Sequence, residues 1–410
     1  MEFIDQYQIQ GIDVHDICRE FGTPLYVYDA DIIKRQISQF RQGFSQVDLK
    51  IKYACKSLTN LSIMKFMHTQ GTGLDTVSIP EIKMGLRVGF KPEDIMFTPN
   101  CVDFSEIEEG VDLSVRINLE NMPNLLKFAE KYGNSIPCSI RLNPHAAAQK
   151  NKDKAEWWHK QSKFGISLEL LEQVKEFEEK YNLNIQGIHI HSSSVIMTPE
   201  IFINGAKAVF DTARQFQNLE FIDFGGGIKV DVGDGKQAID VVDLGRKLDP
   251  VFQDFCKEYG RKLELWFEPG RFLVSDCGIL FTRANVIKEN MGTWFVGVNS
   301  GLNHLIRPMM YDAYHEIVNV SNPTGEMKKY TVVGNICEID NLGKDRFLNL
   351  VREHDIIAIK NAGAYGFSMS SQYNSRFRPA EVFVIDGHAR LIRKRETMED
   401  LLRNQVEIEI

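Results

Sequence analysis

Residues 187–227 read GIHIHSSSVIMTPEIFINGAKAVFDTARQFQNLEFIDFGGG, and this stretch indicates the architecture plainly. Two short runs, GIHIH (187–191) and FIDF (221–224), are rich in apolar, β-branched or aromatic residues and predict strands. Between them, IFINGAKAVFDTARQF (201–216) carries apolar residues at helical spacing. A strand, a helix and a second strand in this order predict two parallel strands joined by a crossover helix.

The same alternation runs from residue 24 to residue 270. Six further strands are predicted at KIKYA (50–54), GLDTV (73–77), IMFTP (95–99), LSVRIN (113–118), CSIRL (138–142) and LELWF (263–267). Amphipathic stretches separate most of them, and several end near glycine. Eight strands alternating with helices favour a parallel (β/α)8 barrel of the TIM type. An open, doubly wound sheet is the alternative, because periodicity does not report whether the sheet closes.

The pattern changes after residue 272. Runs such as LFTRANVIKEN (280–290), KYTVVGNICEI (329–339) and AEVFVIDGHARLIRK (380–394) predict strands separated by turns. We therefore expect a mostly β domain, a barrel or sandwich, at the C-terminal end, with the N-terminal segment joined to it. The predicted domains are 26–272 for the (β/α)8 barrel, and 1–25 with 273–410 for the β domain.

Composition excludes several classes of protein. The 410 residues are 43% hydrophobic and 25% charged, with a net charge of −8, so a basic footprint for nucleic acid is not expected. The seven cysteines are odd in number and form no CxxC pair, which argues against structural zinc and favours a reducing cytoplasm. We expect no secretory signal and no membrane span, because the chain lacks the apolar runs that these need.

Chemically versatile residues follow the predicted barrel strands, at the end where such barrels place their active sites. In chain order they are Lys56, Asp75, Asn143, His191, Ser194, the glycines Gly225, Gly226 and Gly227, Glu268 and Arg271. Each has an ordinary alternative, such as a surface lysine or a tight glycine turn. Their convergence on one rim favours a functional interpretation.

The set is consistent with one cofactor. A partly desolvated Lys56 can form a Schiff base. Backbone amides at Gly225–Gly227 can hold a phosphate, to which Ser194 and Arg271 can add contacts. Glu268 can pair with a protonated ring nitrogen, and His191 can lie against an aromatic ring. A phosphate, a pyridinium and an aldehyde together predict pyridoxal 5′-phosphate, with no metal.

The C-terminal domain adds a second group of candidates. They are Arg307, Tyr311 and His315, then Cys337, Glu338 and Asp340, and then Tyr365 and Asn374. Core packing and turns are the ordinary interpretations. A buried Glu338 would need a partner, because glutamate is seldom fully buried unpaired.

The ordered motifs YACK, GIHIH, DFGGG, EPGR, LIRPMMYDAYHEI, CE and GAYGFSMSSQYN resemble the fold-type III, alanine-racemase-like pyridoxal-phosphate decarboxylases. Within that group, the chain is most similar to the diaminopimelate decarboxylase family, over nearly its whole length. The resemblance implies decarboxylation of meso-diaminopimelate to L-lysine, by a homodimer with composite sites.

The resemblance also implies residue roles. Lys56, Asp75, His191, Ser194, Gly225–Gly227, Glu268, Arg271 and Tyr365 would contact the cofactor. Arg307 and Tyr311 would bind the distal carboxylate of the substrate, with Arg271 and Tyr365 nearby, and Glu338 would bind the distal ammonium. Cys337 would deliver the proton that replaces carbon dioxide. Cys337 and Glu338 would come from the second subunit.

Three departures from the family pattern stand out. Ser193 and Val195 replace a glycine and a glutamine after His191, and Ile339 stands in a motif that often reads CESGD. Residues 146–163 also diverge, and we expect them to form a loop at the mouth of the site.

Two alternatives to diaminopimelate decarboxylation remain. One is decarboxylation of ornithine, arginine or carboxynorspermidine. Arg307 would repel the distal ammonium of ornithine, but carboxynorspermidine carries a carboxylate of its own. The other is a non-catalytic cofactor-binding homologue, against which Lys56 and Cys337 argue.

Overall fold

The structure is a computed structural model, and it describes residues 2–3, 7–143, 162–191, 198–235 and 238–410. The chain divides into two compact units. The barrel unit comprises residues 36–230 and 237–272, and the β unit comprises residues 1–35, 231–236 and 273–410.

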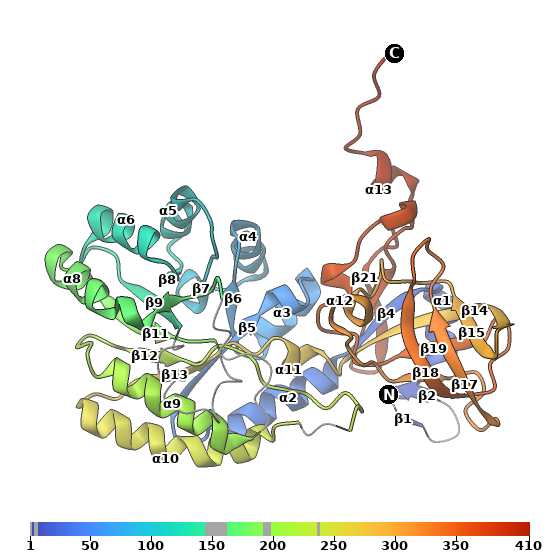
Figure 1. Cartoon of the computed structure of the whole chain (residues 1–410), viewed down its shortest axis with the longest axis horizontal. Helices are drawn as coiled ribbons and strands as arrows, with labels where there is room; N and C mark the ends of the chain where they lie inside the picture. The colour runs from blue at the N-terminus through green and yellow to red at the C-terminus, as the bar shows by residue number, and fades with distance from the viewer. Residues whose placement is uncertain (1, 4–6, 144–161, 192–197, 236–237) are drawn as a thin grey trace. The chain divides into compact units, whose positions relative to one another are not determined.

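Eight parallel strands of the barrel unit form a closed ring (Figure 1). They are β5 (Asp48–Ala54), β6 (Gly73–Thr76), β7 (Ile95–Phe97), β8 (Arg116–Leu119), β9 (Cys138–Asn143), β11 (Ile185–His189), β12 (Phe221–Asp223) and β13 (Glu264–Phe267). The ring closes where β13 pairs with β5, with Glu264 opposite Asp48. A two-residue strand, β10 (Ile166–Ser167), pairs with β9 outside the ring. The predicted closed barrel is confirmed, and the alternative of an open, doubly wound sheet is wrong.

Helices alternate with these strands and surround the ring (Figure 1). They are α2 (Ala30–Gly43), α3 (Leu61–Thr69), α4 (Ile79–Val88), α5 (Phe104–Asp112), α6 (Met122–Tyr132), α8 (Leu171–Tyr181), α9 (Pro199–Ala213) and α10 (Val241–Tyr259). Most begin at a capping side chain, among them Asn60, Ser78 and Thr198, each of which accepts a hydrogen bond from a main-chain N–H of the first turn. Each such cap stabilises its helix by about 1 kcal/mol.

The alternation of side chains along the strands puts a dry layer inside the ring. The ring of Trp266 stacks on Phe221 at 3.8 Å between centroids, and Met96 packs with both. The ammonium of Lys52 lies 4.4 Å from the centre of the Trp266 ring. Side chains two residues apart on a strand point to the same face. The inward residues that follow Phe221 and Trp266 are therefore Asp223 and Glu268, nearer the carboxyl ends of β12 and β13.

The β unit is built on a nine-stranded sheet in which β18-β17-β15-β14-β4-β20-β21 are neighbours in that order and β19 pairs with both β14 and β16. Its strands are β4 (Leu25–Asp29), β14 (Gly278–Asn290), β15 (Thr293–Val298), β16 (Ile317–Asn319), β17 (Met327–Val333), β18 (Asn341–Asn349), β19 (Ile356–Ile359), β20 (Ala380–Ile385) and β21 (His388–Arg393). A separate small sheet holds β1 (Glu2–Phe3), β2 (Tyr7–Ile9) and β3 (Ile12–Asp13).

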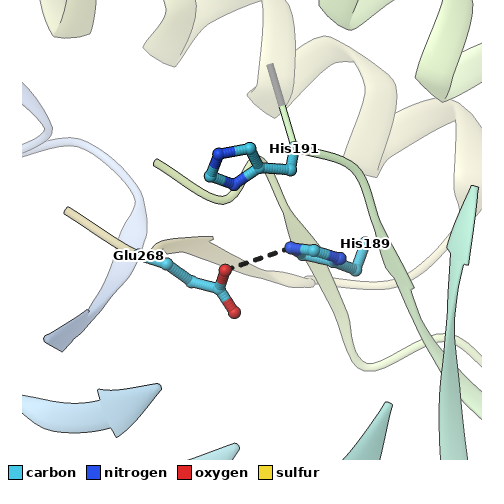
Figure 2. A group of neighbouring side chains, drawn as sticks. All are labelled: His189, His191 and Glu268. Atoms are coloured by element: carbon cyan, nitrogen blue, oxygen red, sulfur yellow. Dashed lines mark hydrogen bonds and ion pairs between the residues drawn. The ribbon is translucent and has the colours of Figure 1, made fainter. Parts of the chain in front are cut away.

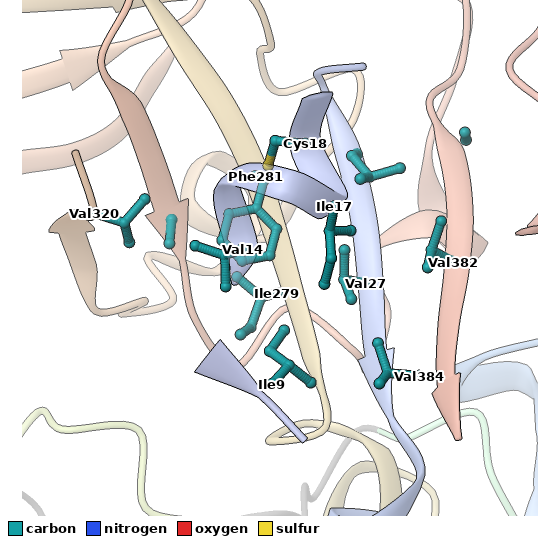
Figure 3. Close-up of a cluster of buried hydrophobic side chains, with 13 residues drawn as sticks. Ile9, Val14, Ile17, Cys18, Val27, Ile279, Phe281, Val320, Val382 and Val384 are labelled. Atoms are coloured by element: carbon teal, nitrogen blue, oxygen red, sulfur yellow. The ribbon is translucent and has the colours of Figure 1, made fainter. Parts of the chain in front are cut away.

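The N-terminal segment enters this sheet through β4, which pairs with β14 on one side and β20 on the other. Helix α1 (Val14–Phe21) packs beside it, and together they build a core with Ile279, Phe281 and Val382 (Figure 3). The β unit runs to Arg35 and so extends beyond residue 25, the boundary predicted from the sequence. The reason is that LYVYD is buried on both faces, as a central sheet strand is. Among the described helices, none has both the length and the apolar character to cross a bilayer.

Candidate active site

Lys56 and Asp75 come from neighbouring strands of the ring. Lys56 lies in the short helix η1 (Cys55–Ser57), directly after β5, and Asp75 lies within β6. The Nζ atom of Lys56 is 2.5 Å from Oδ2 of Asp75. Asp75 is buried, and this burial together with the nearby charge of Glu268 raises its pKa to about 7, although Lys56 opposes the shift. The Lys56 side chain is 31% exposed, whereas that of Asp75 is 1% exposed.

Glu268 follows β13 and faces two histidines, His189 at the end of β11 and His191 just after it (Figure 2). Its Oε2 atom is 3.1 Å from Nε2 of His189. One nitrogen of each histidine and one Glu268 oxygen all lie within 4.8 Å of one another. Burial opposes charge on Glu268, but His189 and Lys56 outweigh it and lower its pKa to about 2. Burial also lowers the pKa of His189, although the charge of Glu268 opposes the shift.

His191 differs from His189 in its exposure. It is half-buried, and its Nδ1 accepts a hydrogen bond from the amide of Gly226 at 3.3 Å. Burial and the positive charges of Arg141 and Lys56 lower its pKa to about 3. The ring is therefore neutral at physiological pH and can lie against an aromatic ligand.

The three glycines after β12 make a turn that side chains could not occupy. Gly225 and Gly227 have φ of 61° and 90°, in the left-handed region that favours glycine. A Cβ atom on Gly226 would lie 2.8 Å from the carbonyl oxygen of Glu268. The amide of Gly225 donates to Oδ1 of Asp223 at 2.7 Å. The turn thus brings bare backbone close to His191 and Glu268.

Sequence reasoning missed two inward residues of the strands. Asp223 is fully buried in β12, and burial and the charge of Glu268 raise its pKa well above the ordinary value. Arg141, in β9, is opposite His189 in the strand register. Both lie inside strands rather than after a strand end, and the alternation of inward and outward positions along β9 and β12 is the signal that indicates them.

The donor set suits a pyridoxal cofactor. Among the described residues, Oε1 of Glu268 is buried and has no hydrogen-bond partner, so an anionic oxygen is available to a protonated ring nitrogen. A lysine amine, a neutral imidazole face and a glycine turn accompany it. Arg271 begins α11 (Arg271–Val274) and is half-buried. Ser194 lies outside the described residues, as do Ser193, Val195 and residues 144–161, so the loop expected at 146–163 is almost wholly outside them.

In the β unit, Arg307 and two tyrosines form a group. Arg307 is buried at the start of α12 (Arg307–Tyr311), and its guanidinium lies 5.8 Å from the ring of Tyr311 and 5.9 Å from that of Tyr365. The ring of Tyr311 is 55% exposed, and Tyr365 has a left-handed φ of 57°. A cation held between aromatic faces is suited to a carboxylate ligand.

Cys337 and Glu338 follow β17, and both are exposed in the chain. The possibility of a buried Glu338 is therefore wrong for the single chain. Instead, Oε1 of Glu338 accepts a hydrogen bond from the Tyr373 hydroxyl at 3.2 Å. Asp340 is the buried acid of this loop, and its Oδ1 accepts a hydrogen bond from the main-chain N–H of Leu302 at 2.6 Å. His315 is buried, and its Nδ1 atom lies 2.9 Å from the carbonyl oxygen of Lys360. This agrees with the interpretation of His315 as a residue of the core.

Comparison with known proteins places the chain in a family. Residues 30–275 match the model of the pyridoxal-dependent decarboxylase, pyridoxal binding domain. A diaminopimelate decarboxylase of Methanothermobacter thermautotrophicus is 38% identical over 97% of this chain and 95% of its own length.

Solved structures agree. The diaminopimelate decarboxylase of M. jannaschii in complex with L-lysine has a TM-score of 0.89 at 29% identity, covering 98% of this chain and 96% of its own. The Helicobacter pylori enzyme, also complexed with L-lysine, has a TM-score of 0.86 at 32% identity, covering 95% and 98%. The chain therefore belongs to the pyridoxal-dependent decarboxylases and, within them, to the diaminopimelate decarboxylase family.

Proposed function

We propose that this chain converts meso-diaminopimelate to L-lysine and carbon dioxide. One observation carries the proposal: the chain matches proteins named for this activity along nearly its whole length. A buried arginine, Arg307, in the domain that follows the barrel supports it. Ornithine and arginine have no distal carboxylate for such a group to bind, whereas diaminopimelate has one.

The barrel unit holds the cofactor. Pyridoxal phosphate, when bound, supplies an electron sink for the bond that breaks. Lys56 would hold its aldehyde carbon, and Glu268, kept anionic by His189, would hold its ring nitrogen in the protonated state. His191 would cover one ring face. Gly225–Gly227, Ser194 and Arg271 would surround the phosphate, and Asp75 would keep Lys56 oriented through their contact.

The β unit would bind the distal end of the substrate. Arg307 and Tyr311 would bind the distal carboxylate, with Arg271 and Tyr365 beside it, and Glu338 would bind the distal ammonium. The bond between Cα and its carboxylate breaks, carbon dioxide leaves, and the thiol of Cys337 gives its proton to Cα. A proton from solvent restores the thiol, so the reaction consumes one proton for each carbon dioxide released.

The working unit would be a homodimer. In the single chain, Cys337 and Glu338 are exposed, which supports sites completed by a second copy. Seven cysteines that are all free support a reducing cytoplasm as the compartment.

Product analysis tests the proposed reaction. Purified, cofactor-loaded protein should turn meso-diaminopimelate into lysine and carbon dioxide in equal amounts. Release of carbon dioxide without lysine, or no release at all, would contradict the proposal.

Subunit complementation tests the composite site. Chains carrying Lys56→Ala and chains carrying Cys337→Ala should each be inactive as pure dimers. After random mixing, half of the dimers are mixed and each holds one intact site, so about a quarter of the parent activity should return. Mixing that restores nothing would place both residues in a site made by one chain.

A further inference from the structure

Two residues from one short helix surround Cys337. They are Tyr373 and Asn374, in η6 (Tyr373–Ser375) of the β unit. The Oδ1 atom of Asn374 accepts the main-chain N–H of Cys337 at 2.8 Å. The Nδ2 atom of the same amide donates to Sγ of Cys337 at 3.0 Å. One side chain therefore holds both the backbone and the sulfur of Cys337.

Tyr373 connects the thiol with Glu338. Its hydroxyl is 3.7 Å from Sγ of Cys337 and 3.2 Å from Oε1 of Glu338. These hydrogen bonds raise the pKa of Tyr373 to about 12, so the hydroxyl stays protonated and can donate to either partner. The proton of one phenol is thus available to the two residues on which substrate binding and proton delivery are proposed to depend.

The backbone at Asn374 is also unusual. Asn374 and Ser375 have φ of 56° and 55°, a left-handed conformation that is costly for residues other than glycine and least costly for asparagine and aspartate. Consecutive residues of this kind persist where the surrounding structure requires them, and they are frequent at functional sites. The conformation turns the Asn374 amide toward Cys337.

The charges around the thiol are mixed. The hydrogen bonds from Asn374 and Tyr373 lower the pKa of Cys337, while Glu338 opposes them. The guanidinium of Arg376 lies in the same segment and donates to the carbonyl oxygen of Asn335 at 3.2 Å. When Cys337 gives up a proton, negative charge develops on a sulfur that already has a donor aimed at it.

We infer that Asn374 and Tyr373 are positioning residues for Cys337: the Asn374 amide aims the thiol and stabilises the charge left on sulfur, and the Tyr373 hydroxyl couples that charge to Glu338. This inference rests on the proposed function, since it gives Cys337 the role of proton donor. It extends that function to two residues that do not themselves touch the reacting carbon.

The test measures the acidity of the Cys337 thiol in the cofactor-loaded enzyme. Iodoacetamide labelling is followed against pH, and the peptide that contains Cys337 is quantified by mass spectrometry because Cys101 is also exposed. Asn374→Gly keeps the left-handed backbone and removes the amide. Asn374→Asp keeps the acceptor for the Cys337 N–H but replaces the donor by a negative charge.

Labelling at a fixed pH below the thiol pKa should fall roughly three- to tenfold in Asn374→Gly and further in Asn374→Asp, with both profiles moved to higher pH. Tyr373→Phe should move the profile in the same direction by less. Asn182→Gly, at a left-handed and exposed asparagine that ends α8 in the barrel unit, should leave the profile unchanged. Asn374→Asp should also lower kcat more than it changes KM.

A Cys337 profile unchanged in Asn374→Asp would overturn the inference. If the reagent does not reach the thiol in the parent enzyme, the ultraviolet absorbance of its thiolate, taken as the difference from Cys337→Ala, provides the same titration and the same criterion. Full turnover in Cys337→Ala would instead refute the proposed proton donor, and the titrations would still decide whether Asn374 controls the thiol.

Discussion

The barrel site and the Cys337 cluster differ in how completely each is formed within one chain. In the barrel, Asp75, His189 and Glu268 are buried, and strands of the ring fix them. In the β unit, Cys337, Glu338 and Tyr373 are exposed and lie outside the strands of the sheet. Both regions nevertheless contain short, specific contacts between side chains.

This contrast separates two tasks. The groups proposed to tune the cofactor need a low-dielectric core, because burial is what shifts the acidity of Asp75 and Asp223 so far. The groups proposed to deliver a proton and read a charged substrate must be reached from solvent. Under the homodimer proposal, the exposed cluster becomes part of a complete site only in the dimer.

Removing the lysine amine should have the largest effect. Lys56→Ala should abolish turnover, by about a thousandfold or more, and also the absorbance of bound cofactor, because Lys56 is the amine proposed to hold the aldehyde carbon. Lys65→Ala, on the exposed side of α3, is the control and should retain both. Residual activity near the parent level in Lys56→Ala would remove the lysine from the proposal.

Neutralising Glu268 should come next. Glu268→Gln keeps the shape of the side chain but removes the charge that His189 stabilises, and turnover should fall by about a hundredfold or more. Cofactor absorbance should shift in position rather than disappear, which separates the variant from Lys56→Ala. Equal kcat values in Glu268→Gln and the parent enzyme would show that this carboxylate does not act on the ring nitrogen.

Substitution of Arg307 tests the substrate-binding role proposed for the β unit. Arg307→Ala should lower kcat/KM for meso-diaminopimelate by about a hundredfold, mainly through KM, because a charged hydrogen bond to the distal carboxylate is lost. Cofactor affinity, measured by titration of absorbance, should not change. A variant that loses cofactor and substrate binding together would indicate damage to the fold instead.

The smallest expected effect is on the pH dependence of stability. The pKa of Asp75 is raised to about 7 in the fold, so its protonated form is favoured there. The stability that Asp75 contributes is fully present below its unfolded pKa of about 3.9 and is lost as pH rises through about 7. Urea unfolding of the cofactor-free protein at about pH 5 and about pH 8 should therefore show a smaller difference in Asp75→Asn than in the parent. An identical difference would show that Asp75 does not titrate in this range.

Most of the barrel could be predicted from the chain because each strand and helix has its own local pattern. All eight predicted ring strands are present, since short apolar runs such as KIKYA and LELWF alternate with helical stretches along the chain. The N-terminal segment is predicted in the β domain, but no local pattern fixes the residue at which that segment ends. LYVYD is apolar enough for either sheet, and its partners, β14 and β20, place it in the β unit.

The candidate site was partly accessible to the same reasoning. Residues after strand ends, such as Lys56 and Glu268, could be named because parallel strands end together. The pairing of His189 with Glu268 joins positions that are distant in sequence and lie on two strands separated by β12. The contact of Asn374 with Cys337 depends on a left-handed backbone that no local pattern of that loop announces. The roles of these residues stay predictions until variants are measured.

A substrate panel tests the central claim most directly. The value of kcat/KM is measured with the cofactor-loaded enzyme for meso-diaminopimelate, carboxynorspermidine, ornithine and arginine, by carbon dioxide release. We expect meso-diaminopimelate to be preferred by about a hundredfold or more, because it alone offers the distal carboxylate and the distal ammonium together on one carbon. A higher kcat/KM for any of the other three would contradict the proposed reading of the substrate by Arg307 and Glu338.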